Sequence, residues 1–521
     1  MFLLFFGILL ALFQLLLFYN FYWKRRYLPS GPTPLPIVGN LLELGKKPPG
    51  YDIFLKWREE YGPIYTYWVG ICFDFYRKLN IYQVGEQPMV AFTEYSLINE
   101  TIVKDGDNYT DRDFFQDFYT LARGKNGLVH MEGQAWREHR KFLMNVFRNL
   151  GVGKNLLEQK VLSEFSAMCE NIDKAIGECP IGEDMEIISH LDLCVGSIIN
   201  SLLFGYQFHG EKTEEFVELK KILNEYMYTI GQPSTQFLMS WWPHLIRHLP
   251  YFKEIFLEVQ RKIMRTYAFF KKQIEEHEND GEYLGDERLD FVSAFMREVK
   301  LRDGKEDYDM ETLYAHLLDF WIAGQETTTD TLNWGIIHII YNMNVQDKLH
   351  KELNSVIGSN RQITLADKID LPYSNAVVNE IMRISNVLPQ NLARRTVQDV
   401  NVRGHLLRKG TSIQPLISCV LYDENIFPNS RQFLPERFLN ENGTHKRFDE
   451  FIPFSIGKRF CAGESLARTE LFLIFVNLFN QYEISPPKYS EMPSKQQNFG
   501  LSVVPLPYKC QIRKRFDSQK E

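Results

Sequence analysis

What the chain has little of narrows its function before any motif is considered. It has no basic excess: 59 Lys and Arg stand against 66 Asp and Glu, a net charge of -7 that argues against a nucleic-acid binder. Its seven cysteines form no C-x-x-C pair, so neither a disulfide framework nor a zinc site is indicated. The twelve histidines show no paired metal-ligand spacing. A chain of 521 residues can bury a large core without such supports.

Charge is also absent from the N-terminal segment. Residues 1–23 contain no charged side chain, and Lys24, Arg25 and Arg26 follow directly. About 22 helical residues reach about 33 Å, enough for a hydrocarbon core of about 30 Å, and the positive-inside rule places the basic end in the cytosol. Residues 1–23 are therefore predicted to be a transmembrane signal anchor. A cleavable signal peptide is the alternative, but the basic start and small-residue cleavage site that it needs are missing.

A stiff spacer separates this segment from the body of the protein. Residues 24–40 combine the basic stop with a stretch, 29–36, that holds four prolines in eight residues. Such a stretch neither continues a helix nor joins a sheet interior, and it predicts an extended spacer. Residues 41–521 show no further linker, repeat or long charge block, so they are predicted to form one large domain.

Hydrophobic periodicity in this domain is mostly helical, and the predicted fold class is mainly α with minor β. Helices are predicted over residues 156–176, 213–228, 253–277, 310–344, 374–385 and 464–480. Short strands are predicted over residues 64–69, 88–92, 399–402 and 411–415.

One stretch interrupts the pattern. Val69-Gly70 recurs as Val84-Gly85, and removing residues 71–85 leaves strands 64–69 and 88–92 joined by a Gly-Glu-Gln turn, a plausible β-hairpin. We interpret residues 71–85 as an insertion, either an unspliced short intron or a genuine surface loop, which folds accept cheaply. Mass-spectrometric detection of a peptide from wholly inside this stretch would contradict the intron hypothesis.

The most informative segment precedes the last predicted helix. Residues 454–463 read F-S-I-G-K-R-F-C-A-G and fit the pattern F-x-x-G-x-R-x-C-x-G, which a chain of this length matches by chance on the order of once in ten thousand. A thiolate at a helix N-terminus is stabilised by unpaired N–H groups and the helix dipole. The glycines let the backbone approach a flat cofactor closely.

Two other interpretations of this segment explain less. A buried structural cysteine leaves the glycines and Arg459 without a role. The sequence G-E-S-L-A over residues 463–467 faintly resembles the nucleophile elbow of α/β-hydrolases, but it lacks the last glycine and no run of parallel strands precedes it.

The segment resembles the signature of the cytochrome P450 superfamily, and the anchor and spacer make the chain similar to the microsomal, family 2-like members. The resemblance implies the cytochrome P450 fold and a haem b (iron protoporphyrin IX) whose axial thiolate, and only metal ligand, is Cys461. By position in the family motifs, the remaining cofactor-binding residues are Trp136, Arg140, Arg394, Phe454 and Arg459. Arg395 is adjacent to Arg394 and is an alternative to it.

Two further motifs support the resemblance. A-G-Q-E-T-T over residues 323–328 lies midway along the longest apolar helix, where an acid and a hydroxyl are costly without a function. Glu326 and Thr327 match the catalytic pair that relays protons in the family; the alternative is a threonine that only bonds back to the preceding turn. Glu380 and Arg383 form an E-x-x-R pair, and Arg437 would be the third member of the family's structural Glu-Arg-Arg triad.

By resemblance, the function is NADPH-dependent monooxygenation of a lipophilic small molecule, whether fatty acid, steroid or foreign compound, at the endoplasmic reticulum membrane with the domain facing the cytosol. Electrons from NADPH would arrive through NADPH–cytochrome P450 reductase, with cytochrome b5 a further candidate partner and membrane lipid a third. Arg137, Lys141 and Lys458 are candidates for steering the acidic reductase. A haem-thiolate isomerase or peroxygenase without a reductase, and a membrane-tethered haem binder without turnover, are the alternatives.

The sequence leaves the substrate open. By family position, we expect the substrate pocket to be lined from residues 114–127, 219–245, the helix before Ala323, 388–392 and near Leu501, with an aromatic wall from 114–119. Trp241 and Trp242 are expected to dip into the membrane interface.

Overall fold

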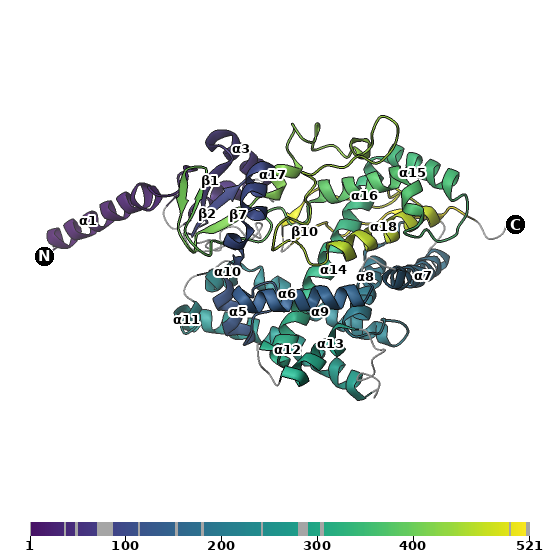
Figure 1. Cartoon of the computed structure of the whole chain (residues 1–521), viewed down its shortest axis with the longest axis horizontal. Helices are drawn as coiled ribbons and strands as arrows, with labels where there is room; N and C mark the ends of the chain where they lie inside the picture. The colour runs from purple at the N-terminus through teal and green to yellow at the C-terminus, as the bar shows by residue number, and fades with distance from the viewer. Residues whose placement is uncertain are drawn as a thin grey trace.

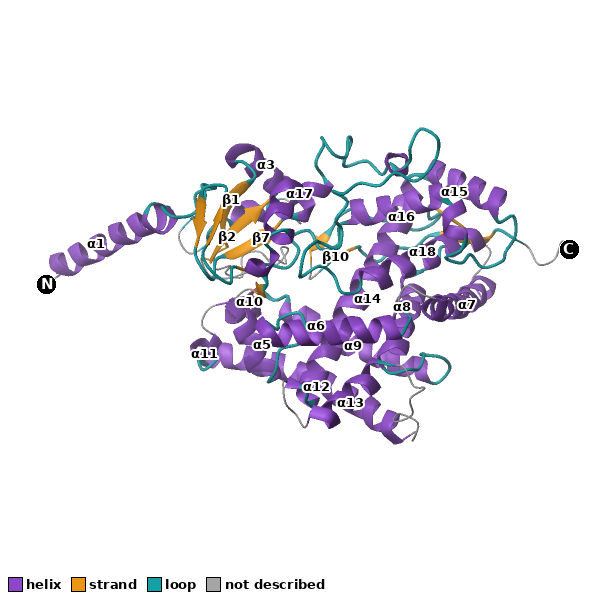
Figure 2. Ribbon diagram, viewed as in Figure 1, coloured by secondary structure: helices purple, strands orange, loops and turns teal. Residues whose placement is uncertain are grey.

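The computed structural model describes residues 2–35, 38–46, 50–69, 87–112, 115–151, 155–178, 182–240, 243–279, 290–302, 307–499 and 502–516. Their helices are α1 Phe2–Phe21, α2 Leu41–Leu44, α3 Tyr51–Tyr61, α4 Tyr95–Ile98, α5 Phe115–Arg123, α6 Gly133–Asn149, α7 Asn155–Glu178, α8 Ile188–Leu203, α9 Lys212–Ile230, α10 Pro233–Ser240, α11 Pro243–Ile246, α12 Pro250–Asn279, α13 Phe291–Arg302, α14 Met310–Tyr341, α15 Met343–Val356, α16 Pro372–Ser385, α17 Ile417–Leu421 and α18 Glu464–Gln481. The strands are β1 Ile64–Val69, β2 Gln87–Phe92, β3 Asp111–Arg112, β4 Arg394–Arg395, β5 Val400–Val402, β6 His405–Leu407, β7 Ser412–Pro415, β8 Tyr482–Ser485, β9 Asn498–Phe499, β10 Val503–Val504 and β11 Gln511–Lys514. The prediction of a mainly helical fold with a small amount of sheet is confirmed (Figure 2).

The predicted helices correspond to α7, α9, α12, α14, α16 and α18, with one difference. The helix predicted over residues 310–344 ends at Tyr341, and Asn342 separates α14 from α15. The Asn342 backbone N–H bonds to Ile339 O at 2.8 Å, which closes the last turn. Helix α8 was not predicted because residues 194–203 are buried on every side, so its sequence carries no amphipathic period.

The largest sheet has five strands in the order β1-β2-β7-β4-β3. Strands β1 and β2 pair antiparallel from Ile64↔Phe92 to Val69↔Gln87, as the predicted hairpin requires. The proposed insertion over residues 71–85 lies outside the described residues. At the other end of the sheet, β3 pairs with β4 so that Arg112 lies opposite Arg394. The sheet gathers beside α3 and α17, away from the helical part of the molecule (Figure 2).

Helix α14 is the axis of the helical part. It packs against α8 and α12 as well as α16 and α18, and most of its length is buried (Figure 1). Helices α14 and α18 are therefore in contact, and the two most informative sequence motifs lie in the middle of α14 and in the loop before α18.

Helix α1 extends away from the rest of the molecule (Figure 1). Among the described residues, no helix meets the length and hydropathy needed to cross a membrane, so the predicted anchor is not confirmed.

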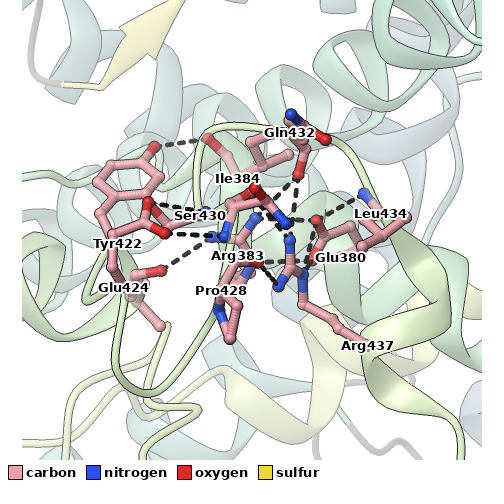
Figure 3. Close-up of polar contacts among 12 residues, drawn as sticks. Glu380, Arg383, Ile384, Tyr422, Glu424, Pro428, Ser430, Gln432, Leu434 and Arg437 are labelled. Carbon is pink, nitrogen blue, oxygen red and sulfur yellow. Dashed lines mark hydrogen bonds and ion pairs between the residues drawn. The ribbon is translucent and has the colours of Figure 1, made fainter.

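A buried ion cluster connects α16 to the segment after α17 (Figure 3). Arg383 donates to both carboxylate oxygens of Glu380, at 2.7 and 2.8 Å, and Arg437 Nε donates to Glu380 Oε1 at 3.2 Å. The Glu380 and Arg383 side chains are 0% exposed, and that of Arg437 is 5% exposed. The prediction that Arg437 joins the pair is confirmed. The two guanidinium groups also donate to the carbonyls of Leu421 and Pro428, so the cluster fixes the loop as well as the helix.

This cluster predicts a large stability loss when its acid is neutralised. Glu380→Gln leaves two buried guanidinium charges facing one neutral amide, and we expect the free energy of unfolding to fall by about 3–5 kcal/mol. Glu436→Gln is the matched control, because Glu436 pairs with a half-exposed Lys348 at 2.6 Å and such pairs contribute about 0–1 kcal/mol. Chemical denaturation of both variants checks the difference; equal losses would contradict it.

Candidate active site

The loop before α18 is built to present Cys461. The Cys461 N–H donates to Phe454 O at 3.0 Å, and the Phe460 N–H donates to Gly457 O at 3.1 Å. Gly457 has φ +80, and a Cβ on it would lie 2.1 Å from Ile102 O, so this turn accepts only glycine. Phe454 packs its ring 4.9 Å from the Arg468 guanidinium on α18. These contacts hold the cysteine just before the N-terminus of α18.

The Cys461 thiol is accessible yet desolvated. Its side chain is exposed, but burial by the surrounding protein raises the pKa of the thiol, while the Gly463 N–H and Arg140 act to lower it. The helix N-terminus therefore supplies the expected donor, but burial outweighs it. A metal cation that bound this thiol would deprotonate it outright.

Four arginines meet next to this loop: Arg112 on β3, Arg140 on α6, Arg394 on β4 and Arg459 in the loop itself. Arg459 lies 3.9 Å from the Trp136 ring, and Arg140 donates to Phe460 O at 2.7 Å. Burial and neighbouring arginines lower the pKa of Arg394 to about 9 and that of Arg459 to about 7. Burial is the largest cause of both shifts, and for Arg459 the charge of Glu132 acts in the opposite direction.

Arg394 has hydrogen-bonding capacity left over. Its Nη2 donates to Ser455 Oγ at 3.3 Å and Ile456 O at 3.0 Å, but Nε and Nη1 are buried with no hydrogen-bond partner among the described residues. Arg395 instead pairs with Glu132 at 2.9 Å. Unsatisfied buried donors on a cationic cluster suit a carboxylate, and haem carries two of them. The residues present therefore fit a haem whose propionates meet the arginines and whose iron meets Cys461.

Arg112 is the member of this cluster that sequence reasoning missed. It donates from Nε to Val129 O at 2.8 Å and from Nη1 to Ala393 O at 3.3 Å. No local motif marks it, and its relation to Arg394 exists only through the pairing of β3 with β4. The remaining predicted cofactor residues are brought together by the fold, and their roles stay predictions.

The predicted catalytic pair lies on the neighbouring helix, α14. Thr327 Oγ1 donates to Ala323 O at 2.7 Å, the back-bonding expected of an ordinary helical threonine. Glu326 accepts from Lys220 Nζ, on α9, at 2.7 Å. The hydroxyl oxygen of Thr327 keeps its acceptor capacity. The two groups are adjacent in the chain but have different partners.

A buried ion pair that sequence reasoning also missed joins three of the segments expected to line the substrate pocket. Arg123 of α5 pairs with Asp319 of α14 at 2.8 Å, and each side chain is 4% exposed. Arg123 also donates to the Tyr226 hydroxyl on α9 at 3.0 Å. An aspartate within the apolar α14 predicts a buried polar partner, but the sequence does not indicate that this partner is Arg123, 196 residues away.

The other residues expected in the pocket or on the surface differ in what the structure shows of them. Phe118 is buried, with its ring 6.0 Å from Phe256, so it is part of the core as well as of the expected wall. Trp241, Trp242, Leu501 and the first position of the expected aromatic wall, Phe114, lie outside the described residues. Arg137 and Lys458, expected to steer a reductase, are exposed and share the carboxylate of Asp107 at 3.3 and 3.1 Å.

The fit of Arg394 to a propionate predicts how haem is retained. Arg394→Met removes a charge-assisted hydrogen bond worth about 1.5–3 kcal/mol, so haem should leave about 10–100-fold faster. Arg395→Met is the matched control, because Arg395 is engaged by Glu132. Transfer of haem to an excess of apomyoglobin measures both rates. Equal rates in the two variants would refute the assignment of Arg394.

Comparison with known proteins agrees with this geometry. The family model "Cytochrome P450" matches residues 29–512. The chain is 33% identical to cytochrome P450 2C23 of Rattus norvegicus over 494 residues, which cover 93% of each chain, and 32% identical to cytochrome P450 2C44 of Mus musculus with the same coverage. It is 30% identical to cytochrome P450 2C8 of Homo sapiens, with 88% of this chain and 89% of that one covered. The chain therefore belongs to the cytochrome P450 family of haem-thiolate monooxygenases.

Proposed function

We propose that the protein is an NADPH-dependent monooxygenase that inserts one oxygen atom of O2 into a lipophilic small molecule. The observation that carries the proposal is the exposed Cys461 side chain near Arg394, whose buried Nε and Nη1 have no hydrogen-bond partner among the described residues. Haem with a thiolate ligand supplies the oxygen chemistry when bound. Cys461 is the ligand, and Trp136, Arg140, Arg394 and Arg459 hold the propionates.

Glu326 and Thr327 hold and move the protons that the reaction consumes. Both lie in the middle of α14, which packs against α18, the helix that follows Cys461. The Thr327 hydroxyl donates its hydrogen to Ala323 O and offers its oxygen as an acceptor. Glu326 is the nearest acid in sequence and is paired with a lysine. The pair favours an oxygen-activating enzyme over an isomerase or peroxygenase, whose family members often lack it.

In the same proposal, electrons reach the site from NADPH–cytochrome P450 reductase, and cytochrome b5 is a second candidate donor. Arg137, Lys141 and Lys458 are exposed on or near the elements around Cys461. Two of them share Asp107, so this surface is less positive than the sequence suggested. Electrostatic attraction of an acidic partner to this surface depends on the positive charge that Asp107 does not neutralise.

The substrate class is a lipophilic small molecule, with fatty acid, steroid and foreign compound as its candidates. The proposal is supported by the buried Phe118 and half-buried Tyr119 of α5, two of the aromatic residues expected to line an apolar substrate pocket. The ring of Tyr119 lies 4.2 Å from that of His130, in the loop after α5.

We further propose that α1 is a single-pass anchor that holds the domain on the cytosolic face of the endoplasmic reticulum. Residues 2–21 carry no charge, and the exposed Tyr22, Trp23 and Tyr27 follow α1 as interface residues do. Arg26 lies 3.4 Å from the Trp23 ring. Deletion of residues 2–27 should release the protein from membranes on alkaline carbonate washing, and retention of the shortened chain would contradict the anchor.

Turnover tests the proposed activity. With NADPH, reductase and a panel of lipophilic compounds, we expect product containing oxygen from isotope-labelled O2. Thr327→Ala removes a proton-transfer group, so product formation should fall on the order of 10²-fold. Thr331→Ala, one turn further along α14 with the same back-bonding at 2.7 Å, is the matched control and should retain activity.

The outcomes separate the alternatives. Product formed with peroxide but not with reductase would favour the peroxygenase, and rearranged product without oxygen from O2 would favour the isomerase. A haem-loaded protein that never consumes NADPH with any compound would favour the non-catalytic haem binder.

A further inference from the structure

A pair of buried histidines connects α6 to α14. His139 Nδ1 and His316 Nε2 are 2.9 Å apart, and the two residues are 1% and 2% exposed. The His139 ring stacks on that of Tyr308 with 4.3 Å between the ring centroids, and the His316 ring stacks on that of Phe320. The other ring nitrogen of His316, Nδ1, lies 3.1 Å from the backbone nitrogen of Leu128, in the loop after α5.

The backbone donor fixes which nitrogen of each ring carries a proton. A backbone N–H can only donate, so His316 Nδ1 is the acceptor and the proton of this ring is on Nε2. His316 Nε2 therefore donates to His139 Nδ1. Burial lowers the pKa of His139 to about 4 and that of His316 well below its usual value, so both rings are neutral at pH 7. The pair thus presents one unprotonated acceptor to the Leu128 N–H.

The N–H groups at the start of residues 127–131 bond to α14. The Leu128 N–H donates to His316 Nδ1 at 3.1 Å, and the Val129 N–H donates to Asp319 Oδ2 at 2.9 Å. Both acceptors are side chains one helical turn apart, so they hold this short segment against one face of α14.

The carbonyl groups of the same segment bond to the arginine cluster. Arg459 donates from Nη1 to Leu128 O at 3.4 Å and from Nη2 to Met131 O. Arg112 donates from Nε to Val129 O at 2.8 Å. The segment therefore lies between α14 and the cluster, and its displacement would move the hydrogen-bond acceptors of both guanidinium groups.

We propose that His316 is a positioning residue for the cofactor: its Nδ1 fixes residues 127–131 and, through them, the guanidinium groups of Arg459 and Arg112. The proposal rests on the proposed function, in which Arg459 holds a haem propionate. It goes further, because it makes haem retention depend on a hydrogen bond between α14 and the loop after α5.

The competing explanation is that His316 only fills space in the core. A side chain of similar size would then serve equally well, whether or not it carried an acceptor atom. Asn and Leu have almost the same shape, and the amide oxygen of Asn takes the place that Nδ1 has in His316. His316→Asn and His316→Leu open the same space, so the difference between them isolates the acceptor.

The first measurement is hydrogen–deuterium exchange of the full-length, haem-loaded protein, followed on peptides that contain residues 127–131. In His316→Leu the buried Leu128 N–H loses its acceptor, so exchange in these peptides should be about 10–100-fold faster than in His316→Asn. His338→Leu is the matched control, because His338 is a half-buried histidine of α14 whose ring stacks on Phe433 at 5.1 Å. It should leave the exchange of these peptides unchanged.

The second measurement is transfer of haem from the same variants to an excess of apomyoglobin. His316→Leu should release haem on the order of 10-fold faster than His316→Asn, since the acceptors of two arginines are no longer held in place. His338→Leu should release haem at the rate of the parent protein.

Equal exchange in His316→Asn and His316→Leu overturns the proposal, and so does faster exchange in His316→Leu without faster release of haem. If neither variant holds haem, His139→Asn and His139→Leu provide the same comparison, because only the Asn variant keeps an acceptor for His316 Nε2. Exchange and release should then be faster in His139→Leu.

Neither measurement needs NADPH or reductase. A protein that shows both differences but no turnover would refute the proposed monooxygenase and keep the positioning role. Turnover in a protein whose two variants have equal rates would do the reverse.

Discussion

The clustering of positive charge beside Cys461 is the constraint on which the rest of the site depends. Arg112 and Arg394 face each other across β3 and β4, and Arg140 and Arg459 approach them from α6 and from the cysteine loop. Backbone carbonyls satisfy much of their hydrogen bonding, as at Thr110 for Arg459, but a carbonyl supplies no net charge. Arg394 Nε and Nη1 have no hydrogen-bond partner among the described residues, so a carboxylate that reached Arg394 would complete its hydrogen bonding. A cofactor with two carboxylates and a central cation meets this need and that of the thiol together.

Helix α14 is largely apolar but contains buried acidic side chains, and each of them needs a polar partner. Asp319, Glu326 and Asp330 each face a partner from another segment: Arg123, Lys220 and Ser502. A buried carboxylate without such a partner would be costly. The partners lie on α5, on α9 and beside β10, so the same contacts fix the position of the segments around α14. Residues that serve the chemistry and residues that hold the fold are therefore adjacent on this helix.

Much of the fold was predictable because its signals are local. The periodic helices, the β1–β2 hairpin and the cysteine loop depend on residues close together in sequence, where spacing alone carries the information. The E-x-x-R pair and Arg437 were predicted only through their resemblance to a known motif. Helix α8 was not predicted because it is buried on all sides and so has no amphipathic pattern. Arg112 and Lys220 escaped because their importance arises from contacts with distant residues; Lys220 and Glu326 are 106 positions apart.

The most direct test of the haem-thiolate assignment is the carbon monoxide difference spectrum of the dithionite-reduced, membrane-expressed protein. We predict the red-shifted Soret band that thiolate ligation produces, and its loss in Cys461→Ala while the protein stays folded. An imidazole-type band, or a folded protein that binds no haem, would contradict the account at its centre.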